Sequence, residues 1–449
     1  MDAELRESDL AFSLLRAAQT ITLVIRDGRS LDQAISHVTQ DVATAQARGA
    51  IRDLSYFGLR NLGRGVVLTE LTTRKSELNP LELTELMGLG FALLWPSRAP
   101  KYPPHTVVNQ VVSACAADPQ FKRAKGLVNA CLRTFLRETE ALCKQANKDQ
   151  LAQWNLPNWW LKKLQQQHPT IWRELVIQSQ HHAPLVLRVN SRWGTPLQYQ
   201  ERLAQAGIVA EVIGPQAVWV HKGMSVDLLP GFDQGHVSVQ DSAAQLAAPL
   251  LDLQNGQRVL DACAAPGGKT GHLLELANVS VLALDSSASR LKRVHSNVER
   301  IAHTLPKSFA FRSLAAKAED VSAWWDGKPF DAILADVPCT GSGVVRRHPD
   351  IPWLRRERDV ANLSHIQHKI LGALWSTLRP GGKLLFVTCS IFSEEGPLLA
   401  KAFIEKHPDA QPLEAPGLVL PLPFGGAADP MGASPDGFFY ALFQKQLSD

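Results

Sequence analysis

Short aliphatic runs alternate with amphipathic stretches through the C-terminal half of the chain. The runs at 258–260, 281–284, 330–335 and 383–387 predict strands buried on both faces, because parallel strands covered by helices read as continuous apolar segments. Residues 271–277, which follow the first run, carry apolar side chains at helical spacing. This succession predicts a doubly wound α/β domain, in which ligands lie beyond the carboxyl ends of the strands.

The rest of the chain shows two other patterns. Residues 1–142 carry apolar stripes at helical spacing and predict an all-helical domain. Residues 143–230 mix helical segments with short strand-like runs and predict a small α+β domain. Residues 231–449 then hold the α/β domain, with a Gly/Pro/Ala-rich loop at 425–437 before a last strand at 438–444.

Composition narrows the class of protein. With 449 residues, of which 45% are hydrophobic, the chain is long enough for about two or three domains with their own cores. It has no apolar run of membrane-spanning length and begins with a charged segment, so we expect a cytoplasmic protein that does not enter a membrane. The six cysteines form no C-x-x-C pair or other metal-ligand spacing, which favours reduced thiols and no metal site. A net charge of +4 permits nucleic-acid binding, but only a local basic patch would argue for it.

The segment 263–268, CAAPGG, follows the first predicted strand and consists of small residues. Glycine lets a backbone approach a ligand closely because it has no Cβ. The spacing matches neither the G-x-G-x-x-G dinucleotide pattern nor a phosphate-binding loop. Asp261, at the end of the strand, suits a ligand with a cationic amino-acid group, such as S-adenosylmethionine. Asp285 closes the second strand, where doubly wound folds place an acid that accepts hydrogen bonds from ribose hydroxyls.

Two cysteines follow the third and fourth predicted strands. Cys339 lies in a Pro/Gly-bounded loop, and Cys389 lies between Thr388 and Ser390. A thiolate adds readily to electron-poor carbons, and C6 of a cytosine or uracil is such a carbon. Addition there activates C5 toward a methyl group from a sulfonium donor, after which an acid/base group must remove the C5 proton. We therefore interpret these two thiols as reactive, and Cys263 and the cysteines of the N-terminal half as ordinary buried thiols.

An arginine-rich segment at 344–358 follows Cys339 and also contains a histidine and Trp353. Arginines contact phosphates, and an aromatic ring stacks on a base. Single-stranded or looped RNA is an easier target than a duplex, because a paired base must first be turned out. The residues that we predict to contact RNA are Arg346, Arg347, His348, Arg355 and Arg356.

Four motifs in this order and spacing, CAAPGGK, DVPCTGSG, RRHPDIPWLRR and TCS, resemble those of the bacterial RNA cytosine-C5 methyltransferases of the Sun/Fmu type. The resemblance covers essentially the whole chain. The N-terminal part, with KGLVNACLR at 125–133, resembles the NusB-like RNA-binding domain of that family, and the middle part resembles its small RRM-like domain. The resemblance implies a Rossmann-like class I methyltransferase domain at the C-terminus, with S-adenosylmethionine as methyl donor and no metal. It further implies a monomer that acts on 16S ribosomal RNA, either unassembled or in an early small-subunit particle.

The resemblance also implies a role for each residue of the reacting site. Cys389 would attack C6 of the cytosine, and Cys339 would assist release of the product. Asp336 would hold the edge of the base, and Lys269 would support that site. Which cytosine of the RNA is modified does not follow from the resemblance.

The donor site departs from the family at one position. Where the family usually offers an aspartate to the adenine amine, this chain has Lys317, so Glu319 or Asp320 would replace it. The donor contacts that the resemblance implies are Cys263, Ala264, Ala265, Pro266, Gly267, Gly268, Lys269, Asp285, Asp320 and Asp336.

Two other functions are compatible with parts of the pattern. A DNA cytosine-C5 methyltransferase would use Cys339 as the nucleophile, but the T-C-S motif at Cys389 and the NusB-like front domain argue against it. An RNA-binding or ribosome-assembly factor with a degenerate methyltransferase fold would not need the intact donor loop or both cysteines. Substituting each cysteine in turn distinguishes the RNA methyltransferase from the DNA methyltransferase. A test of S-adenosylmethionine binding distinguishes it from the assembly factor.

Overall fold

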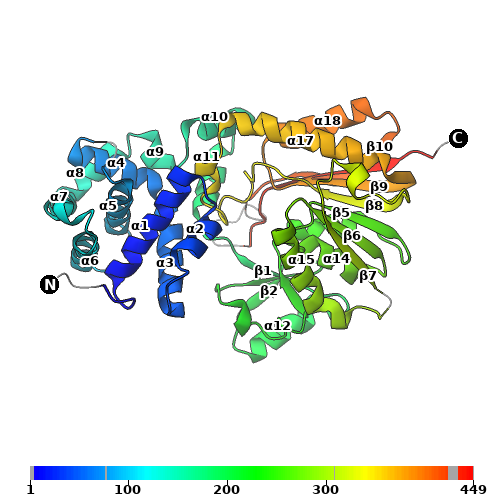
Figure 1. Cartoon of the computed structure of the whole chain (residues 1–449), viewed down its shortest axis with the longest axis horizontal. Coiled ribbons are helices and arrows are strands. Elements are labelled where there is room, and N and C mark those ends of the chain that lie inside the picture. Colours follow the sequence, from blue (N-terminus) through cyan, green and yellow to red (C-terminus); the bar gives the residue numbers. More distant parts are fainter. Residues whose placement is uncertain (1–4, 76–77, 308, 423–432, 448–449) are drawn as a thin grey trace. The chain divides into compact units, whose positions relative to one another are not determined.

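The chain is described by a computed structural model in which contacts divide it into two compact units (Figure 1). The first unit comprises Met1–Trp172 and His348–Arg356, and the second comprises Arg173–Arg347 and Glu357–Asp449. The residues that the structure describes are 5–75, 78–307, 309–422 and 433–447. Among the helices in these ranges, none combines the length and the apolar character needed to cross a membrane.

The first unit consists of helices in its described residues, which confirms the predicted helical N-terminal region. Helix starts follow local capping chemistry: Ser30 and Gln33, for example, form a capping box that satisfies backbone N–H groups at the start of the second helix. The helices are α1 (Leu10–Asp27), α2 (Leu31–Val38), α3 (Ala45–Leu59), α4 (Leu62–Thr73), α5 (Leu81–Leu94), α6 (Pro104–Ala117), α7 (Lys125–Arg137), α8 (Thr139–Ala146), α9 (Gln150–Trp154), α10 (Asn158–Gln167) and α16 (Ile351–Leu354).

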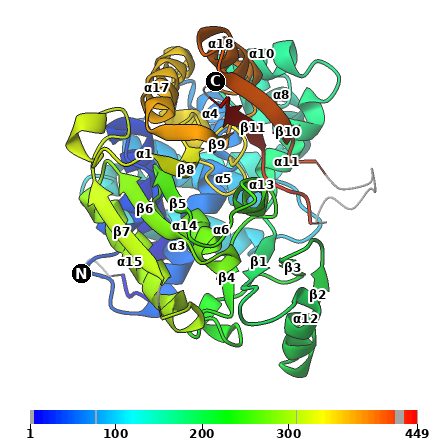
Figure 2. The same cartoon turned by 90° about the vertical axis from the view of Figure 1, so that its right-hand side faces the viewer.

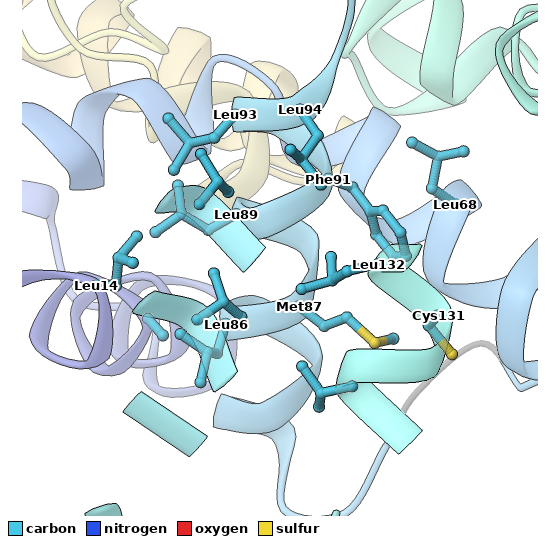
Figure 3. Close-up of a cluster of buried hydrophobic side chains, with 14 of the residues drawn as sticks. Leu14, Leu68, Leu86, Met87, Leu89, Phe91, Leu93, Leu94, Cys131 and Leu132 are labelled. Atoms are coloured by element: carbon cyan, nitrogen blue, oxygen red, sulfur yellow. The ribbon is translucent and has the colours of Figure 1, made fainter. Parts of the chain in front are cut away.

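Helix α5 forms the centre of the core of this unit. All of its residues from 83 to 94 are buried, and Figure 3 shows its leucines, Met87 and Phe91 packed against Leu14 of α1 and Leu132 of α7. Helices α4 and α5 approach closely where two glycines meet: a Cβ on Gly65 would lie 2.9 Å from Cα of Gly88. A helix that is apolar on every side is buried, so the sequence pattern of α5 accounts for its place in the core.

The segment His348–Arg356 belongs to the first unit, although the residues before and after it in the chain belong to the second. The carboxylate of Asp350 accepts a hydrogen bond of 2.9 Å from the N–H of Leu31, at the start of α2. The side chains of Trp353 and Leu354 pack against a cluster of buried residues from α1 to α4. This part of the arginine-rich segment is therefore anchored by its acid and its apolar residues.

In the second unit, α11 (Trp172–Gln180) leads into a small antiparallel sheet of β1 (Leu185–Val189), β2 (Ala210–Val212), β3 (Ala217–Val220) and β4 (Val237–Val239), in the order β2-β3-β1-β4. Helix α12 (Pro196–Gln205) packs on it through Tyr199 and Leu203, which contact strand residues such as Leu187 and Val218 in one core cluster. The α+β character predicted for this region is confirmed, with helices continuing as far as Gln180.

A larger mixed sheet of seven strands follows in the described residues, with the order β10-β11-β9-β8-β5-β6-β7 (Figure 2). Strands β5 to β9 pair in parallel, whereas β10 and β11 are antiparallel to their neighbours. Strand β5 pairs with β6 on one side and with β8 on the other, which is the arrangement at which doubly wound sheets bind ligands. The strands are β5 (Arg258–Ala262), β6 (Ser280–Asp285), β7 (Ala310–Ala315), β8 (Phe330–Asp336), β9 (Leu378–Thr388), β10 (Ala410–Val419) and β11 (Phe438–Lys445).

Helices cover both faces of this sheet, which confirms the α/β class. On one face, Val259 of β5 packs in a cluster with α14 (Gly268–Leu276) and α15 (Ala288–Ile301). On the other face, Leu260 packs in a cluster with α17 (Glu357–Ser376) and α18 (Pro397–Lys406). Successive side chains of a strand point to opposite faces, so the continuous apolar runs of the sequence supply both cores. Most of the predicted loop at 425–437 lies outside the described residues.

Candidate active site

The loop between β5 and α14 brings backbone atoms to the carboxyl edge of the sheet. Cys263 adopts a left-handed conformation with φ 63°, and Gly267 has φ 99°. A Cβ on Gly267 would lie 2.8 Å from Cα of Val294, so the close packing of loop and helix α15 requires glycine there. Burial, reinforced by the charge of Asp336, raises the pKa of the Cys263 thiol, which therefore stays protonated and unreactive.

Asp285, at the end of β6, binds this loop through hydrogen bonds of its carboxylate. Its Oδ2 accepts the N–H of Ala265 at 3.2 Å, and its Oδ1 accepts the N–H of Ser287 at 2.9 Å. Arg290 lies 3.6 Å from the same carboxylate and also donates to the carbonyl of Ala265 at 3.0 Å. The acid that the sequence assigned to a ribose contact thus first fixes the loop that precedes α14, and it retains further lone pairs for a ligand.

Asp261 of β5 is fully buried beneath the loop. Its Oδ2 accepts the hydroxyl of Thr270 at 2.6 Å, while its Oδ1 has no hydrogen-bond partner. Burial raises the pKa of this carboxyl to about 7. The side chain is too enclosed to meet a ligand directly, so its effect on the site is electrostatic and acts through α14.

Lys269 and Asp336 meet at the edge where β5 and β8 lie side by side. Their Nζ and Oδ2 atoms are 2.6 Å apart, and the side chains are 11% and 28% exposed. Burial works against the charged amine, but Asp336 more than offsets it, so the pKa of Lys269 is raised and the ammonium form persists. Cys389 also raises the pKa of Lys269, but by less than Asp336 does.

The two thiols that the sequence singled out lie together. Sγ of Cys339, in the loop after β8, is 3.3 Å from Sγ of Cys389, which follows β9. The hydrogen bond to Cys389, together with burial, holds the pKa of Cys339 well above its usual value. Cys339 therefore keeps its proton.

The loops that carry the two thiols share one buried carboxylate, which the sequence analysis did not identify. Glu395 accepts hydrogen bonds from Thr340 and Ser390, the residues that follow the two cysteines. Ser-Glu-Glu at 393–395 is visible in the sequence, but nothing in the pattern shows which of the two glutamates points inward.

A second unforeseen contact ties α14 to the small sheet. Arg188 of β1 makes a bidentate ion pair with Glu275 of α14, with N–O distances of 2.9 and 2.7 Å. It also donates to the carbonyl of Gly268 at 2.8 Å, at the first turn of that helix. Bidentate arginine–carboxylate pairs fix geometry as well as charge, so the donor loop has a rigid support.

The arginine-rich segment does not form one basic surface. Arg346 is 3% exposed, because it donates to Asp436 at 2.6 Å and to the hydroxyl and carbonyl of Ser434 at 2.6 and 2.7 Å. Its guanidinium is therefore held in a buried ion pair, and its contact with RNA stays a prediction. Arg347 joins the same cluster through Asp436 and through Asp241 at 2.8 Å. Its contact with RNA stays a prediction.

His348 and Arg356 are exposed and Arg355 is partly exposed, all within the first unit. Near the expected adenine site, Asp320 is exposed and accepts the hydroxyl of Ser322 at 3.0 Å. Glu319, in contrast, is half-buried. Which of these two acids contacts the adenine in place of Lys317 stays a prediction. Among the described residues, no group of histidines, cysteines and carboxylates is arranged to hold a metal ion.

Comparison with known proteins identifies the family. Residues 248–444 match the model of the 16S rRNA methyltransferase RsmB/F family, and residues 156–227 match the ferredoxin-like domain of RsmF/B-like methyltransferases. Ribosomal RNA small subunit methyltransferase B of Vibrio cholerae is 37% identical over 96% of both chains. The protein of the same name from Pseudomonas putida is also 37% identical, over 96% of this chain and 98% of the relative.

Solved structures share the fold. The crystal structure of PH0851 has a TM-score of 0.73 at 22% identity and covers 99% of this chain and all of the other. NSun6 from Pyrococcus horikoshii, solved with SFG, has a TM-score of 0.55 at 17% identity and covers 65% of this chain and 99% of the other. The relatives above match 96% of this chain at a higher identity than these structures do, so the relatives identify the family. The chain belongs to the RsmB/F family of 16S rRNA methyltransferases, and it is an rRNA methyltransferase.

Proposed function

We propose that this rRNA methyltransferase modifies C5 of a cytosine through a temporary bond between Cys389 and C6 of the base. The observation that carries the proposal is the pair of thiols 3.3 Å apart beside the Lys269–Asp336 ion pair. Carbon 5 of cytosine is a poor nucleophile, and sulfur addition at C6 is the chemistry that activates it. A mechanism that used only one thiol would leave the position of Cys339, protonated and in contact with Cys389, unexplained.

The steps balance as follows. Sγ of Cys389, as a thiolate, bonds to C6, and the electron pair of the C5–C6 double bond moves to C5. C5 takes the methyl group as the bond between that methyl and the sulfonium sulfur of the donor breaks, with the electron pair staying on sulfur. The C5 proton then leaves to a base, the C–H electrons restore the C5–C6 double bond, and the C6–S bond breaks to return the thiolate. Cys339 assists this release. Asp336 accepts from the exocyclic amine of the cytosine, and Lys269 holds that carboxylate through the 2.6 Å ion pair.

S-adenosylmethionine fits the donor site and would supply the methyl group. The backbone of the loop at 263–268, which leads directly to Lys269, packs closely against helix α15. Gly267 has no side chain that would widen this contact. Asp285 would meet the ribose with its remaining lone pairs, and Asp320 or Glu319 would lie toward the adenine. Binding of S-adenosylmethionine, measured by calorimetry, separates this enzyme from an assembly factor that kept only the fold.

The substrate that we infer is 16S ribosomal RNA, unassembled or in an early particle. The family match supports this RNA, and the residues proposed to contact it are Arg346, Arg347, His348, Arg355 and Arg356. A target in single-stranded or looped RNA spares the enzyme the cost of unpairing the base.

A trapping experiment tests the mechanism. A 16S rRNA fragment that contains 5-fluorocytidine cannot lose a C5 proton, so the adduct with the protein should persist on a denaturing gel and map to Cys389 by mass spectrometry. Cys389→Ala should form no adduct, whereas Cys339→Ala should accumulate one even with unmodified RNA. Cys143→Ala, a substitution in the first unit, serves as the control and should behave like the parent. An adduct that maps to Cys339 would reverse the two roles and point to the DNA-type mechanism.

A further inference from the structure

Glu395 is a fully buried acid in the turn that follows Cys389. Its Oε1 accepts the backbone N–H of Thr340 at 2.8 Å and the side-chain amide of Gln367 at 3.2 Å. Its Oε2 accepts the hydroxyl of Thr340 at 2.5 Å and that of Ser390 at 2.6 Å. One carboxylate therefore binds the residue after Cys339 and the residue after Cys389.

Further hydrogen bonds from the same acid and its partners extend this arrangement to the backbone on both sides. The carbonyl of Glu395 accepts the hydroxyl of Thr388, the residue before Cys389, at 3.0 Å. Gln367, on α17, donates to the carbonyl of Pro338, the residue before Cys339, at 2.8 Å. Each cysteine is thus held on both sides by groups that converge on Glu395.

A direct contact between the two loops completes the network. Ser342 and Ser390 have their hydroxyl oxygens 2.8 Å apart, and the N–H of Gly343 donates to the carbonyl of Cys389 at 3.0 Å. Buried polar networks of this kind restrict the geometry of a site, although here Oε1 of Gln367 is buried without a hydrogen-bond partner. With Glu395 removed, the N–H of Thr340 would lose this acceptor, while direct contacts such as these and the hydrogen bond of 2.9 Å from the N–H of Ile391 to the hydroxyl of Ser342 would still join the two loops.

We propose that Glu395 is a positioning residue that sets the separation and orientation of the thiols of Cys339 and Cys389. The inference rests on the proposed function, because it assigns the residue to the two-thiol reaction. Glu395 does not touch the base or the donor; it acts through Thr340 and Ser390. Bond formation at C6 and release of the product use different sulfur atoms on one ring, so both atoms must keep their places through the whole cycle.

A merely structural role for Glu395 predicts a different result. A buried acid that serves only folding would lower the thermal stability on substitution and leave the chemistry of the folded fraction unchanged. A positioning residue changes the rate of adduct formation per folded molecule. It leaves the affinity for the donor unchanged, since the donor loop follows β5, whereas the two cysteines follow β8 and β9. A misplacement of about 1 Å costs roughly 10²-fold in rate.

The test compares three variants by the rate of adduct formation with 5-fluorocytidine RNA in a single turnover. Glu395→Ala should react roughly 10- to 100-fold more slowly than the parent, with unchanged affinity for S-adenosylmethionine. Glu395→Gln should recover most of that rate, because its amide oxygen still accepts from Thr340 and Gln367 and its amide N–H still reaches the two hydroxyls. Glu405→Ala, an exposed acid on α18, should match the parent.

The outcomes separate this inference from the proposed function. If the parent forms no adduct, the thiol mechanism itself fails. If the parent reacts and folded Glu395→Ala reacts at the same rate, Glu395 does not position the thiols. A glutamine variant as slow as the alanine variant would show that charge, not hydrogen-bond geometry, is what matters, and would also overturn the inference. Should Glu395→Ala not fold, Ser390→Ala removes the 2.6 Å hydrogen bond to Glu395 together with the contacts of that hydroxyl to Ser342 and to the N–H of Phe392, and a rate equal to that of the parent would overturn the inference.

Discussion

The donor loop at 263–269 and the arginine-rich segment at 344–358 are both short motifs, but the structure uses them in opposite ways. The donor loop stays together on one edge of the sheet and holds its residues next to Asp285 and Asp336. The arginine-rich segment is divided between the two units: Arg346 is buried in the second, and His348–Arg356 belongs to the first.

The difference teaches which sequence signals carry a reliable meaning. Glycine and other small residues are required by local backbone geometry, so their function can be predicted from neighbours in the sequence. The role of an arginine depends on which carboxylate it meets. For Arg346 that carboxylate belongs to Asp436, far along the chain, and no local pattern announces it.

The largest expected effect concerns the donor edge. Asp336→Asn removes the negative charge that fixes Lys269 and, in the proposed function, holds the cytosine. We expect kcat to fall about 10²- to 10⁴-fold, the range for loss of a positioned acid/base group, with little change in melting temperature. Methyl transfer to the rRNA fragment in a single turnover measures it. A loss below threefold would place the reacting site elsewhere.

The next effect sharpens the contrast within the arginine-rich segment. Arg346→Met leaves Asp436 with Arg347 as its remaining ion-pair partner and removes both donors to Ser434, so it should destabilise the fold by about 3 kcal/mol. Arg356→Ala, at an exposed position, should change stability by less than about 0.5 kcal/mol but weaken RNA binding and reduce its salt dependence. Urea unfolding and RNA titrations at several salt concentrations give both numbers. Equal stability of the two variants would contradict the division of the segment.

A pH experiment tests the electrostatics under the donor loop. The pKa of Asp261 is raised by burial to about 7, whereas an unfolded aspartate titrates near 3.9. The native state therefore binds an extra proton between these values, and the contribution of this group to stability declines as the pH rises from about 4 to 7. The parent should lose of order 4 kcal/mol over that range relative to Asp261→Asn, since each pKa unit is worth about 1.4 kcal/mol. Parallel urea titrations of the two proteins measure this, and a constant difference between them would count against a neutral Asp261.

The smallest effect concerns the anchor of His348–Arg356. Asp350→Ala removes the acceptor for the N–H of Leu31 and should cost about 1 kcal/mol, the usual value for a lost helix cap. Hydrogen exchange at the start of α2 should report faster opening there and no change in β5. Unchanged protection of Leu31 would mean that the apolar contacts of Trp353 and Leu354 suffice.

Much of the catalytic domain could be predicted from the sequence because its central strands are continuous apolar runs. Strands β5, β6, β8 and β9 all contain the predicted runs, and the cysteines that follow two of them do meet. The edge strands escaped prediction for physical reasons: β10 contains Pro412, Pro416 and Gly417, and β7 is largely exposed. An edge strand needs neither a full hydrogen-bond ladder nor two buried faces, so its sequence is poorly constrained.

The reacting residues were predictable to the extent that they end strands. Asp336 ends β8, Cys339 lies in the loop after it, and Cys389 directly follows β9, whereas Lys269, in the first turn of α14, was identified only by the family resemblance and Glu395 was not identified. Its partners Thr340 and Gln367 lie in other elements, and only the fold brings them together. Long-range polar contacts of this type are the part of a site that a single sequence does not reveal.

Because His348–Arg356 belongs to the first unit, each unit is built from two separate stretches of the polypeptide. The polypeptide leaves the second unit after Arg347 and returns to it at Glu357, so no single cut in the backbone yields two intact pieces. A truncated polypeptide that starts at Arg173 would still carry Trp353 and Leu354 but would lack the apolar neighbours that cover them. Such a fragment should be prone to aggregation, and its rescue by adding residues 1–172 as a separate chain would show that the protein can be reassembled by complementation.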